Sequence, residues 1–435
     1  MGFWHMVRRL GGLVGLRVVG AGLGFLTQII LARLFLPSDV GLIFTAMSGA
    51  VLLTFFITAG FPALNLVTVP RLISQPGSSR SLPAFHGAAL RVLALPWALS
   101  LVGAAVAYGQ LPPGSAARVL LVYGALVSIP GIFIIHNSAT ANGLSRFTLS
   151  YLPDFVLRPG LLLLLLGGAL ALGLPMPWWG VLGLALLAAL LVAAVQAVLM
   201  GKDGLSLRHW ASARPAYTRA LLPRALSLLL VALVAGAFTD LITLLAGLLL
   251  PPDQVALVAV AVRLAAISAF VVQAAQQMVL PDAAAALVRR DHQTLDRLLW
   301  RMNLLTIATM LAGLLGAALL GRWVLGFFGP TYPAAYGLLL VFMAGQTLRA
   351  LSGLNQHLLA LAGHQSQTAF ACLAAVVVVL AAALLLTPHL GAMGLGLAVI
   401  AAEIVWLLGL ARKARKLVGR RADMLWLVQR HAPAE

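Results

Sequence analysis

The sequence has 435 residues, of which 62% are hydrophobic and 9% charged, with a mean hydropathy of +1.02 and a formal net charge of +18. A soluble core cannot hide this much apolar surface, whereas a bilayer requires it, so the composition indicates a polytopic membrane protein. The apolar runs reach about 20 residues without alternation, which excludes an outer-membrane barrel. The positive charge gathers in short loops between these runs, which is typical of membrane topology and excludes nucleic acid as a partner.

The apolar runs predict an all-α protein with about twelve transmembrane helices, because a helix of about 20 residues crosses the hydrocarbon core. In chain order, the expected spans are 10–32, 41–66, 84–108, 118–141, 155–173, 178–200, 220–249, 255–280, 300–320, 335–361, 366–387 and 391–411. With a cytoplasmic N-terminus, the outer segments hold only Arg33, Arg118 and Arg322 among the basic residues. This asymmetry predicts that both termini are cytoplasmic.

An internal repeat organises the chain. Leu31–Asp39 reads LARLFLPSD and Leu245–Asp253 reads LAGLLLPPD, with six of nine positions identical at an offset of 214 residues. Each copy ends one apolar run and precedes the next, so we interpret it as the seam of a duplication that produced two pseudo-repeated six-helix lobes around a shared cavity. The expected parts are an N-terminal six-helix lobe at 1–200, a cytoplasmic linker at 201–219, a C-terminal six-helix lobe at 220–411 and a basic cytoplasmic tail at 412–435.

Polar residues inside the spans are the candidate functional groups, because ionisable groups in a membrane are costly and usually face a cavity. Asp240 and Arg263 lie at similar depths on consecutive antiparallel helices and can pair, either as a structural ion pair or as one that opens when an anion takes the arginine. Three sets of residues each form a stripe along one face of an expected helix. Such stripes favour a cavity, but they are also typical of contacts between helices. They are Arg17, Gly24 and Gln28; Thr54, Phe61 and Asn65; and Arg263, Phe270, Ala274 and Gln277.

Further charged groups lie in the later spans. Arg349 lies mid-span near Gln346, and Glu403 is the only glutamate inside a span, with no partner evident from the sequence. Glu403 is therefore a candidate proton-coupling carboxylate. Arg158 lies close enough to the cytoplasmic side for its side chain to snorkel to the membrane surface, and it can also pair with Asp154 at i, i+4. Arginines outnumber carboxylates in the spans, which suits an anionic phosphate or pyrophosphate group and does not suit organic cations.

The sequence argues against an enzyme. The outer loops are too short for a catalytic domain, and the eleven acidic residues are scattered. The single cysteine, Cys372, excludes an internal disulfide and a cysteine-based metal site, so we expect no metal and no cofactor. No G-x-x-x-x-G-K-[ST] motif is present, so energy would come from an ion gradient, the membrane potential or consumption of the product.

Residues 29–44, IILARLFLPSDVGLIF, resemble the first hairpin of the Wzx-type polysaccharide-unit flippases, in which an Ala-Arg pair ends helix one and a Pro/Asp/Gly turn begins helix two. The C-terminal half is similar to that family at the LLLPPD turn and at further single positions. These positions are Asp240, Ala261 to Arg263, Leu280-Pro281, Phe328-Gly329 before Tyr332, and Gly345-Gln346. The family belongs to the multidrug/oligosaccharidyl-lipid/polysaccharide exporter superfamily.

The resemblance implies a flippase that carries undecaprenyl-pyrophosphate-linked O-antigen, capsule or exopolysaccharide units across the bacterial inner membrane by alternating access. Its expected partners are the lipid-linked oligosaccharide, membrane lipids and polysaccharide polymerase or ligase machinery. The alternatives are an ion-coupled multidrug exporter of the same fold and a membrane-embedded polysaccharide polymerase. Carried over by position or inferred from the spans, the candidate substrate-binding residues are Arg17, Gln28, Arg33, Asn65, Asp240, Arg263 and Arg349, and the candidate coupling residues are Asp240 and Glu403.

Overall fold

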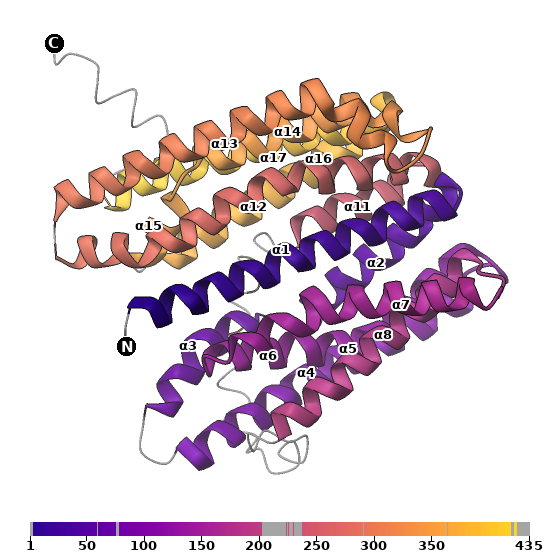
Figure 1. The fold of residues 1–435 in the computed structure, drawn as a ribbon, viewed down its shortest axis with the longest axis horizontal. Helices are drawn as coiled ribbons and strands as arrows, with labels where there is room; N and C mark the ends of the chain where they lie inside the picture. Colours follow the sequence, from indigo (N-terminus) through magenta and orange to yellow (C-terminus); the bar gives the residue numbers. More distant parts are fainter. Residues whose placement is uncertain are drawn as a thin grey trace. The chain divides into compact units, whose positions relative to one another are not determined.

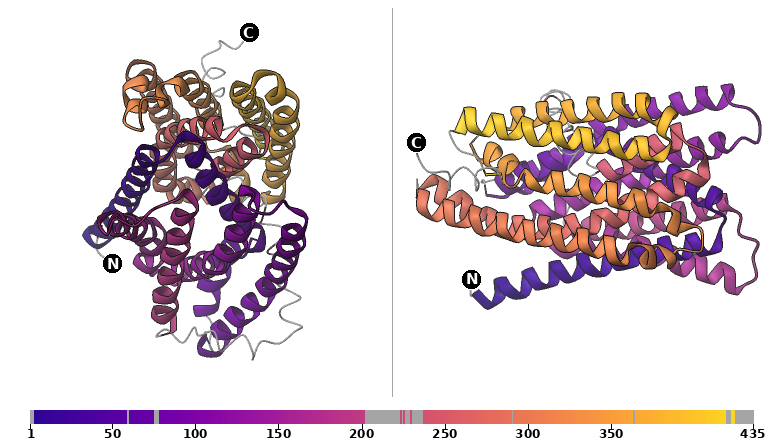
Figure 2. Two further views of the ribbon diagram at one scale, coloured as in Figure 1. Left: turned by 90° about the vertical axis from the view of Figure 1, so that its right-hand side faces the viewer. Right: turned by 90° about the horizontal axis from the view of Figure 1, so that it is seen from above.

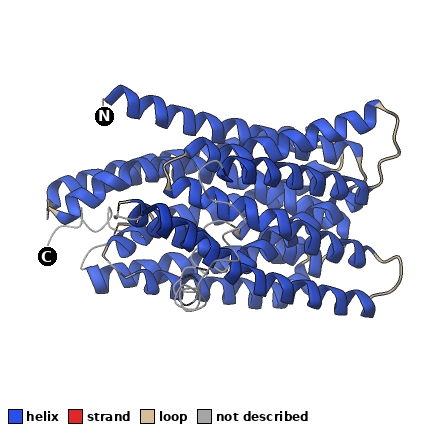
Figure 3. Ribbon diagram, turned by 90° about the horizontal axis from the view of Figure 1, so that it is seen from below, coloured by secondary structure: helices blue, strands red, loops and turns tan. Residues whose placement is uncertain are grey.

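The computed structural model describes residues 3–58, 60–74, 78–201, 223, 225, 229, 237–289, 291–362, 364–418, 422 and 423. Within these residues the chain is helical, with short loops and no strand (Figure 3). It divides into two compact units, Met1–Leu244 and Leu245–Glu435, whose helices are labelled in Figure 1 and drawn from two further sides in Figure 2. The all-α class predicted from the sequence is confirmed.

The helices of the first unit follow one another through short loops. A π-helical turn, η1, lies between α6 and α7, and the last helix, α11, crosses into the second unit. The elements are α1 (Phe3–Leu34), α2 (Pro37–Thr58), α3 (Phe61–Ile73), α4 (Ser78–Gln110), α5 (Ala116–Gly143), α6 (Phe147–Leu152), η1 (Pro153–Leu157), α7 (Arg158–Ala171), α8 (Trp178–Gly201) and α11 (Phe238–Leu249).

The second unit is likewise a helical bundle, and a single 3₁₀ turn, η2, precedes α14. Its elements are α12 (Pro252–Val288), α13 (His292–Gly326), η2 (Tyr332–Ala335), α14 (Tyr336–Leu351), α15 (Asn355–Leu361), α16 (Gln365–Leu390) and α17 (Ala392–Val418).

Ten of the described helices are long and apolar enough to cross a membrane, and the shorter apolar helices Val18–Leu34, Phe61–Ile73 and Phe238–Leu249 accompany them. Each of the twelve expected spans coincides with helix, although the seventh is described mainly from Phe238 onward. The expected linker beyond residue 201 and the tail beyond residue 418, apart from 422 and 423, lie outside the described residues. The lobe boundaries and the orientation of the termini therefore stay predictions.

The repeated motif forms the same local structure in both halves. α1 ends at Leu34 and α2 begins at Pro37, while α11 ends at Leu249 and α12 begins at Pro252. Both second helices start with proline and carry an aspartate in the first turn. Proline lacks the amide that a helix start leaves unpaired, and a carboxylate is favourable at the positive helix end. The motif is thus a helix stop followed by a helix start, as its sequence predicts.

The expected second span, 41–66, is not one continuous helix, which corrects the sequence-based prediction. It is interrupted after Thr58, and α3 begins after Gly60, whose φ of 80° lies in the left-handed region. Pro62 occupies the first turn of α3, where the missing amide of proline costs no hydrogen bond. A Cβ at position 60 would collide with the backbone carbonyl of Ala225, so both the conformation and the close approach require glycine.

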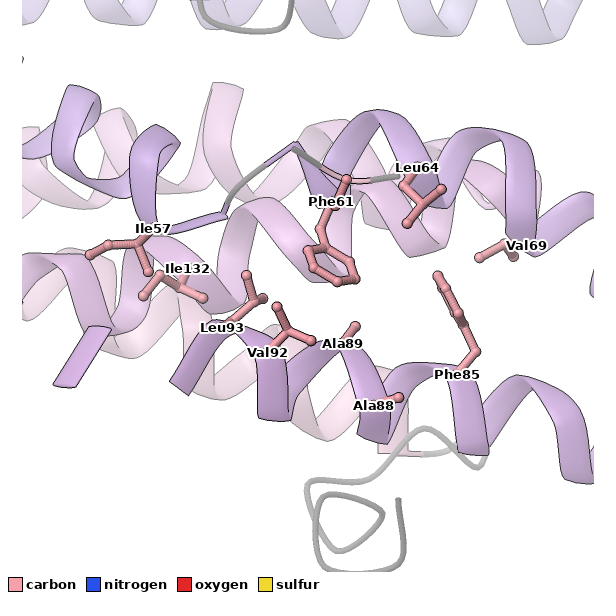
Figure 4. Close-up of a cluster of buried hydrophobic side chains, with 11 residues drawn as sticks. Ile57, Phe61, Leu64, Val69, Phe85, Ala88, Ala89, Val92, Leu93 and Ile132 are labelled. Atoms are coloured by element: carbon pink, nitrogen blue, oxygen red, sulfur yellow. The ribbon is translucent and has the colours of Figure 1, made fainter. Parts of the chain in front are cut away.

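The core of the first unit joins four helices around the start of α3. Phe61 and Leu64 on α3 pack with Phe85 and Leu93 on α4, and Ile132 of α5 belongs to the same cluster (Figure 4). Since α3 is short, these contacts, and not its own length, fix its position beside α4 and α5.

In the second unit, small residues bring α14 and α17 close together. A Cβ at Gly396 of α17 would lie 2.7 Å from Cγ1 of Val341 on α14, and one at Gly345 of α14 would lie 3.3 Å from Cγ1 of Val399 on α17. Close approach at small residues is how membrane helices gain packing contacts without a hydrophobic driving force. This approach places the polar side chains of α14 and α17 within reach of one another.

Candidate functional site

A buried ion pair joins α14 and α17 in the second unit. Nε of Arg349 donates to Oε1 of Glu403 at 2.9 Å, and the side chains are 21% and 2% exposed, respectively. The second oxygen of Glu403, Oε2, is buried and has no hydrogen-bond partner. The guanidinium also lies 5.9 Å from the ring centre of Trp406, at the outer limit of a cation–π contact. Two residues that the sequence singled out separately thus form one charged site.

The partner of Glu403 was missed from the sequence, although a signal for it existed. Arg349 lies thirteen residues after Tyr336 at the start of α14, and Glu403 lies eleven residues after Ala392 at the start of α17. In the predicted topology both helices run in the same direction across the membrane, so similar distances from their starts place both groups at similar depth. The same comparison of depth is what predicts the pair of Asp240 and Arg263.

A second ion pair lies in the first unit. Nη1 of Arg158 is 3.2 Å from Oδ1 of Asp154, with side-chain exposures of 28% and 41%. This confirms the pairing expected from the i, i+4 spacing. Asp154 belongs to the π-helical turn η1, which packs against α1 so closely that a Cβ at Gly20 would lie 2.6 Å from the carbonyl oxygen of Phe155.

Asp240 accepts a hydrogen bond from a serine inside the first unit. The hydroxyl of Ser48 on α2 donates to Oδ1 of Asp240 on α11 at 2.8 Å. Arg263 lies half-buried on α12. Because Asp240 belongs to the first unit and Arg263 to the second, their expected ion pair stays a prediction.

The remaining candidates occupy different environments. Gln28 on α1 is half-buried, and its Oε1 has no hydrogen-bond partner. Arg33 is exposed in the last turn of α1, where a cation complements the negative helix end. The side chain of Arg17 lies outside the described part of the chain, as do those of Phe270 and Gln277. The predicted stripe Thr54, Phe61 and Asn65 does not lie on a single helix, because the break before α3 separates its first member from the other two.

Asn65 is completely buried and hydrogen-bonded to α5. Its Nδ2 lies 3.2 Å from Nδ1 of His136, 3.3 Å from the carbonyl oxygen of His136 and 3.0 Å from Oγ1 of Thr140. Nε2 of His136 lies 3.1 Å from Nδ1 of His86 on α4. Neither histidine was predicted from the sequence as a functional residue, although each falls inside an expected span. Among the candidates predicted from the sequence, the structure therefore brings together Arg349 with Glu403 and connects Asn65 to two further titratable residues.

The chain resembles solved structures over nearly its whole length. No family model and no curated protein matches the sequence. An inward-facing multidrug resistance MATE family transporter of the MOP superfamily aligns with a TM-score of 0.65 and 16% identity over 96% of both chains. An outward-facing structure of such a transporter gives a TM-score of 0.61 and 15% identity over 95% of this chain and 96% of that one.

The fold is MATE-like. A third neighbour, from Pyrococcus furiosus, is described as a MOP superfamily transporter whose binding pocket has reverse polarity, which suggests a different function for it. It aligns with a TM-score of 0.57 and 15% identity over 94% of this chain and 96% of that one. The MATE-like fold and the ten apolar helices together make this a multi-pass membrane protein.

Proposed function

We propose that this MATE-like protein is a flippase, which moves an undecaprenyl-pyrophosphate-linked oligosaccharide across the bacterial inner membrane by alternating access. The neighbours of this fold include inward-facing and outward-facing transporters, which supports a transport cycle between two states. The charge pattern of the helix interiors supports an anionic cargo.

The observation that carries the proposal is the state of three carboxylates on the described helices, Asp154, Asp240 and Glu403. Glu403 is paired with Arg349, Asp154 is paired with Arg158, and Asp240 accepts from Ser48. A pocket for organic cations needs carboxylates that are available to the cation, since a buried positive charge requires a partner. The carboxylates here are already engaged, whereas Arg263 adds a further cation on α12.

Arginine suits the pyrophosphate group of the cargo. Its planar guanidinium donates two parallel hydrogen bonds to phosphate oxygens, and it stays charged at every relevant pH. Burying an unpaired phosphate charge in hydrocarbon would cost about tens of kcal/mol in an ideal low-dielectric medium. We therefore expect Arg17, Arg33 and Arg263 to hold the head group, while the polyprenyl tail stays in the lipid.

The main alternative is an ion-coupled multidrug exporter. Structural neighbours that are multidrug resistance transporters favour it, because the same fold performs that task in them. The Pyrococcus furiosus neighbour supports the opposite possibility, since its pocket is described as having reverse polarity. The sign of the charge that the cargo carries is therefore the property that a test must decide.

The proposal is tested in proteoliposomes with a fluorescent short-chain polyprenyl-pyrophosphate saccharide, whose head-group translocation is measured by quenching from one side. Arg263→Ala is expected to slow translocation by at least about tenfold, because a hydrogen bond to a charged group contributes about 1.5–3 kcal/mol and about 1.4 kcal/mol corresponds to tenfold. Arg297→Ala is the matched control, since this exposed arginine of α13 bonds to Gln293 and Thr294 within its own helix. It should transport like the wild type.

Efflux of a small amphiphilic cation is measured in the same vesicles. Cation efflux without translocation of any of several pyrophosphate-linked sugars would reject the flippase and support the exporter. Equal translocation by wild type and Arg263→Ala would reject the role of this arginine.

A further inference from the structure

Three polar side chains from consecutive helices of the first unit form a buried hydrogen-bonded chain. Asn65 on α3, His136 on α5 and His86 on α4 are 0%, 0% and 2% exposed. The amide of Asn65 contacts one ring nitrogen of His136 at 3.2 Å, and the other ring nitrogen contacts His86 at 3.1 Å. Two hydrogen-bonded imidazoles inside a membrane domain are costly to bury, and intramembrane titratable groups are usually functional.

The contacts of Asn65 define the direction of the chain. The amide atom that faces α5 lies 3.3 Å from the carbonyl oxygen of His136, which can only accept a hydrogen bond, so this atom is the nitrogen. It therefore donates to Nδ1 of His136, and the proton of that ring resides on Nε2. Nε2 then donates to Nδ1 of His86. Nδ2 of Asn65 and both ring nitrogens of His136 are thus hydrogen-bonded while His136 is neutral.

The same residues can satisfy a protonated His136. Oδ1 of Asn65 is buried and has no hydrogen-bond partner. A half-turn of the amide exchanges Oδ1 and Nδ2. It gives up the bonds from Nδ2 to the carbonyl oxygen of His136 and to Thr140, and it presents an acceptor to a proton on Nδ1 of His136. The hydroxyl of Thr140, which donates to the carbonyl oxygen of His136 at 2.9 Å, can then turn to donate to Oδ1 instead. Both N–H groups of the imidazolium then have acceptors, Oδ1 of Asn65 and Nδ1 of His86.

We propose that Asn65, His136 and His86 form a proton-binding site inside the first unit. A proton from water adds to Nδ1 of His136, the hydrogen bond from Nδ2 of Asn65 breaks, and a new bond from Nδ1 to Oδ1 forms. The chain gains one positive charge, and the bond between His136 and His86 is retained. The inference goes beyond the proposed flippase and holds whichever cargo the protein carries.

Other titratable groups also lie on the helices packed against the site. α8, which packs against α5, has no titratable residue. Among the described side chains, those on the remaining packed helices are Asp39 on α2, Arg71 on α3, Arg91 and Tyr108 on α4, Arg118 and Tyr123 on α5, Tyr151 on α6, and Asp154 in η1, which pairs with Arg158.

Protonation of His136 changes the contact between α3 and α5. Uptake reverses the hydrogen bond between Asn65 and His136 while the bond from α5 to α4 keeps its direction. Asn65 lies within the first two turns of α3, directly after the left-handed break at Gly60. Protonation therefore acts near the start of the short helix α3, directly after this backbone break.

The test measures the protonation of histidine directly in the full-length protein. Nitrogen-15 histidine spectra are recorded in lipid nanodiscs from about pH 8 to about pH 5, the range in which histidine ordinarily titrates. His136→Gln and His86→Gln assign the two resonances. The exposed His389 near the end of α16 provides a histidine resonance from outside the site for comparison.

The expected result is that His136 converts from the Nε2–H tautomer to an imidazolium within this range. Asn65→Leu, which removes the acceptor, should keep His136 neutral throughout, while Asn65→Asp should extend the protonated form to more alkaline pH. Both variants retain the two histidines, so they test whether Asn65 controls the protonation of His136 even where a histidine variant fails to fold. A His136 that stays neutral at every pH in the folded wild type would overturn the proposal and leave a purely structural bridge.

Discussion

Arg349 and Glu403 approach to 2.9 Å between α14 and α17, and the carboxylate is 2% exposed. Removing one partner of a buried pair leaves an uncompensated charge, which costs about 3–5 kcal/mol. We therefore expect Glu403→Leu to lower the free energy of unfolding by about 3 kcal/mol, and Glu403→Leu with Arg349→Met to recover most of it. Thermal and denaturant unfolding in detergent, arranged as a double-mutant cycle, measures the coupling.

The pair of Asp154 and Arg158 is the matched control for that cycle, because its side chains are 41% and 28% exposed. Exposed pairs contribute about 0–1 kcal/mol. Equal coupling energies in the two cycles would contradict the assignment of Arg349 and Glu403 as a buried pair.

The break at Gly60 is predicted to tolerate no side chain. Gly60→Ala would place a Cβ against the carbonyl of Ala225 at a φ of 80°. The left-handed conformation alone costs about 1–2 kcal/mol for a residue with a Cβ, and the collision adds to it. We expect a clear drop in the melting temperature of Gly60→Ala. Gly103→Ala on α4 has open space around its Cβ and should be neutral or stabilising, by up to about 1 kcal/mol.

The bond between Ser48 and Asp240 is predicted to stabilise the packing of α2 against α11. Ser48 is completely buried, and a hydrogen bond to a charged group contributes about 1.5–3 kcal/mol. Ser48→Ala should lower the free energy of unfolding by an amount in this range. Ser100→Ala is the control, since its hydroxyl bonds only to the carbonyl of Trp97 in its own helix. A loss no larger than that of Ser100→Ala would count against the bond.

Asp291 caps the start of α13, and the backbone amide of Thr294 that it accepts from lowers the pKa of its carboxyl. Because the folded pKa is lowered, the contribution of the cap is present above the ordinary pKa of aspartate and is lost as the pH falls through the lowered value. Hydrogen-exchange protection of the first turn of α13 should therefore decrease on acidification.

Asp291→Asn should keep the cap and remove this pH dependence, because asparagine caps without titrating. Asp291→Ala should lose protection at every pH. Exposed Asp282 on α12 provides the control variant Asp282→Asn, which should leave the first turn of α13 unchanged. Protection in the wild type that does not vary with pH would refute the role of the carboxylate.

The sequence by itself determined the helical class, the position of the spans, the repeated hairpin turn and the pair of Asp154 and Arg158. These features depend on local patterns: an apolar run long enough to cross the bilayer, proline and aspartate at a helix start, and an i, i+4 spacing. Each acts within a few turns of one helix, so it can be recognised without knowing what the helix packs against.

Only the tertiary structure decided the partner of Glu403, the break at Gly60 and the chain from Asn65 through His136 to His86. The spans are apolar on nearly every side, so their sequences carry little information on how each helix is rotated about its axis. The rotation and depth of each helix follow from small residues and side-chain shapes at the contacts. These contacts join residues 50 or more positions apart, and they alone bring a buried carboxylate to an arginine and one histidine to another.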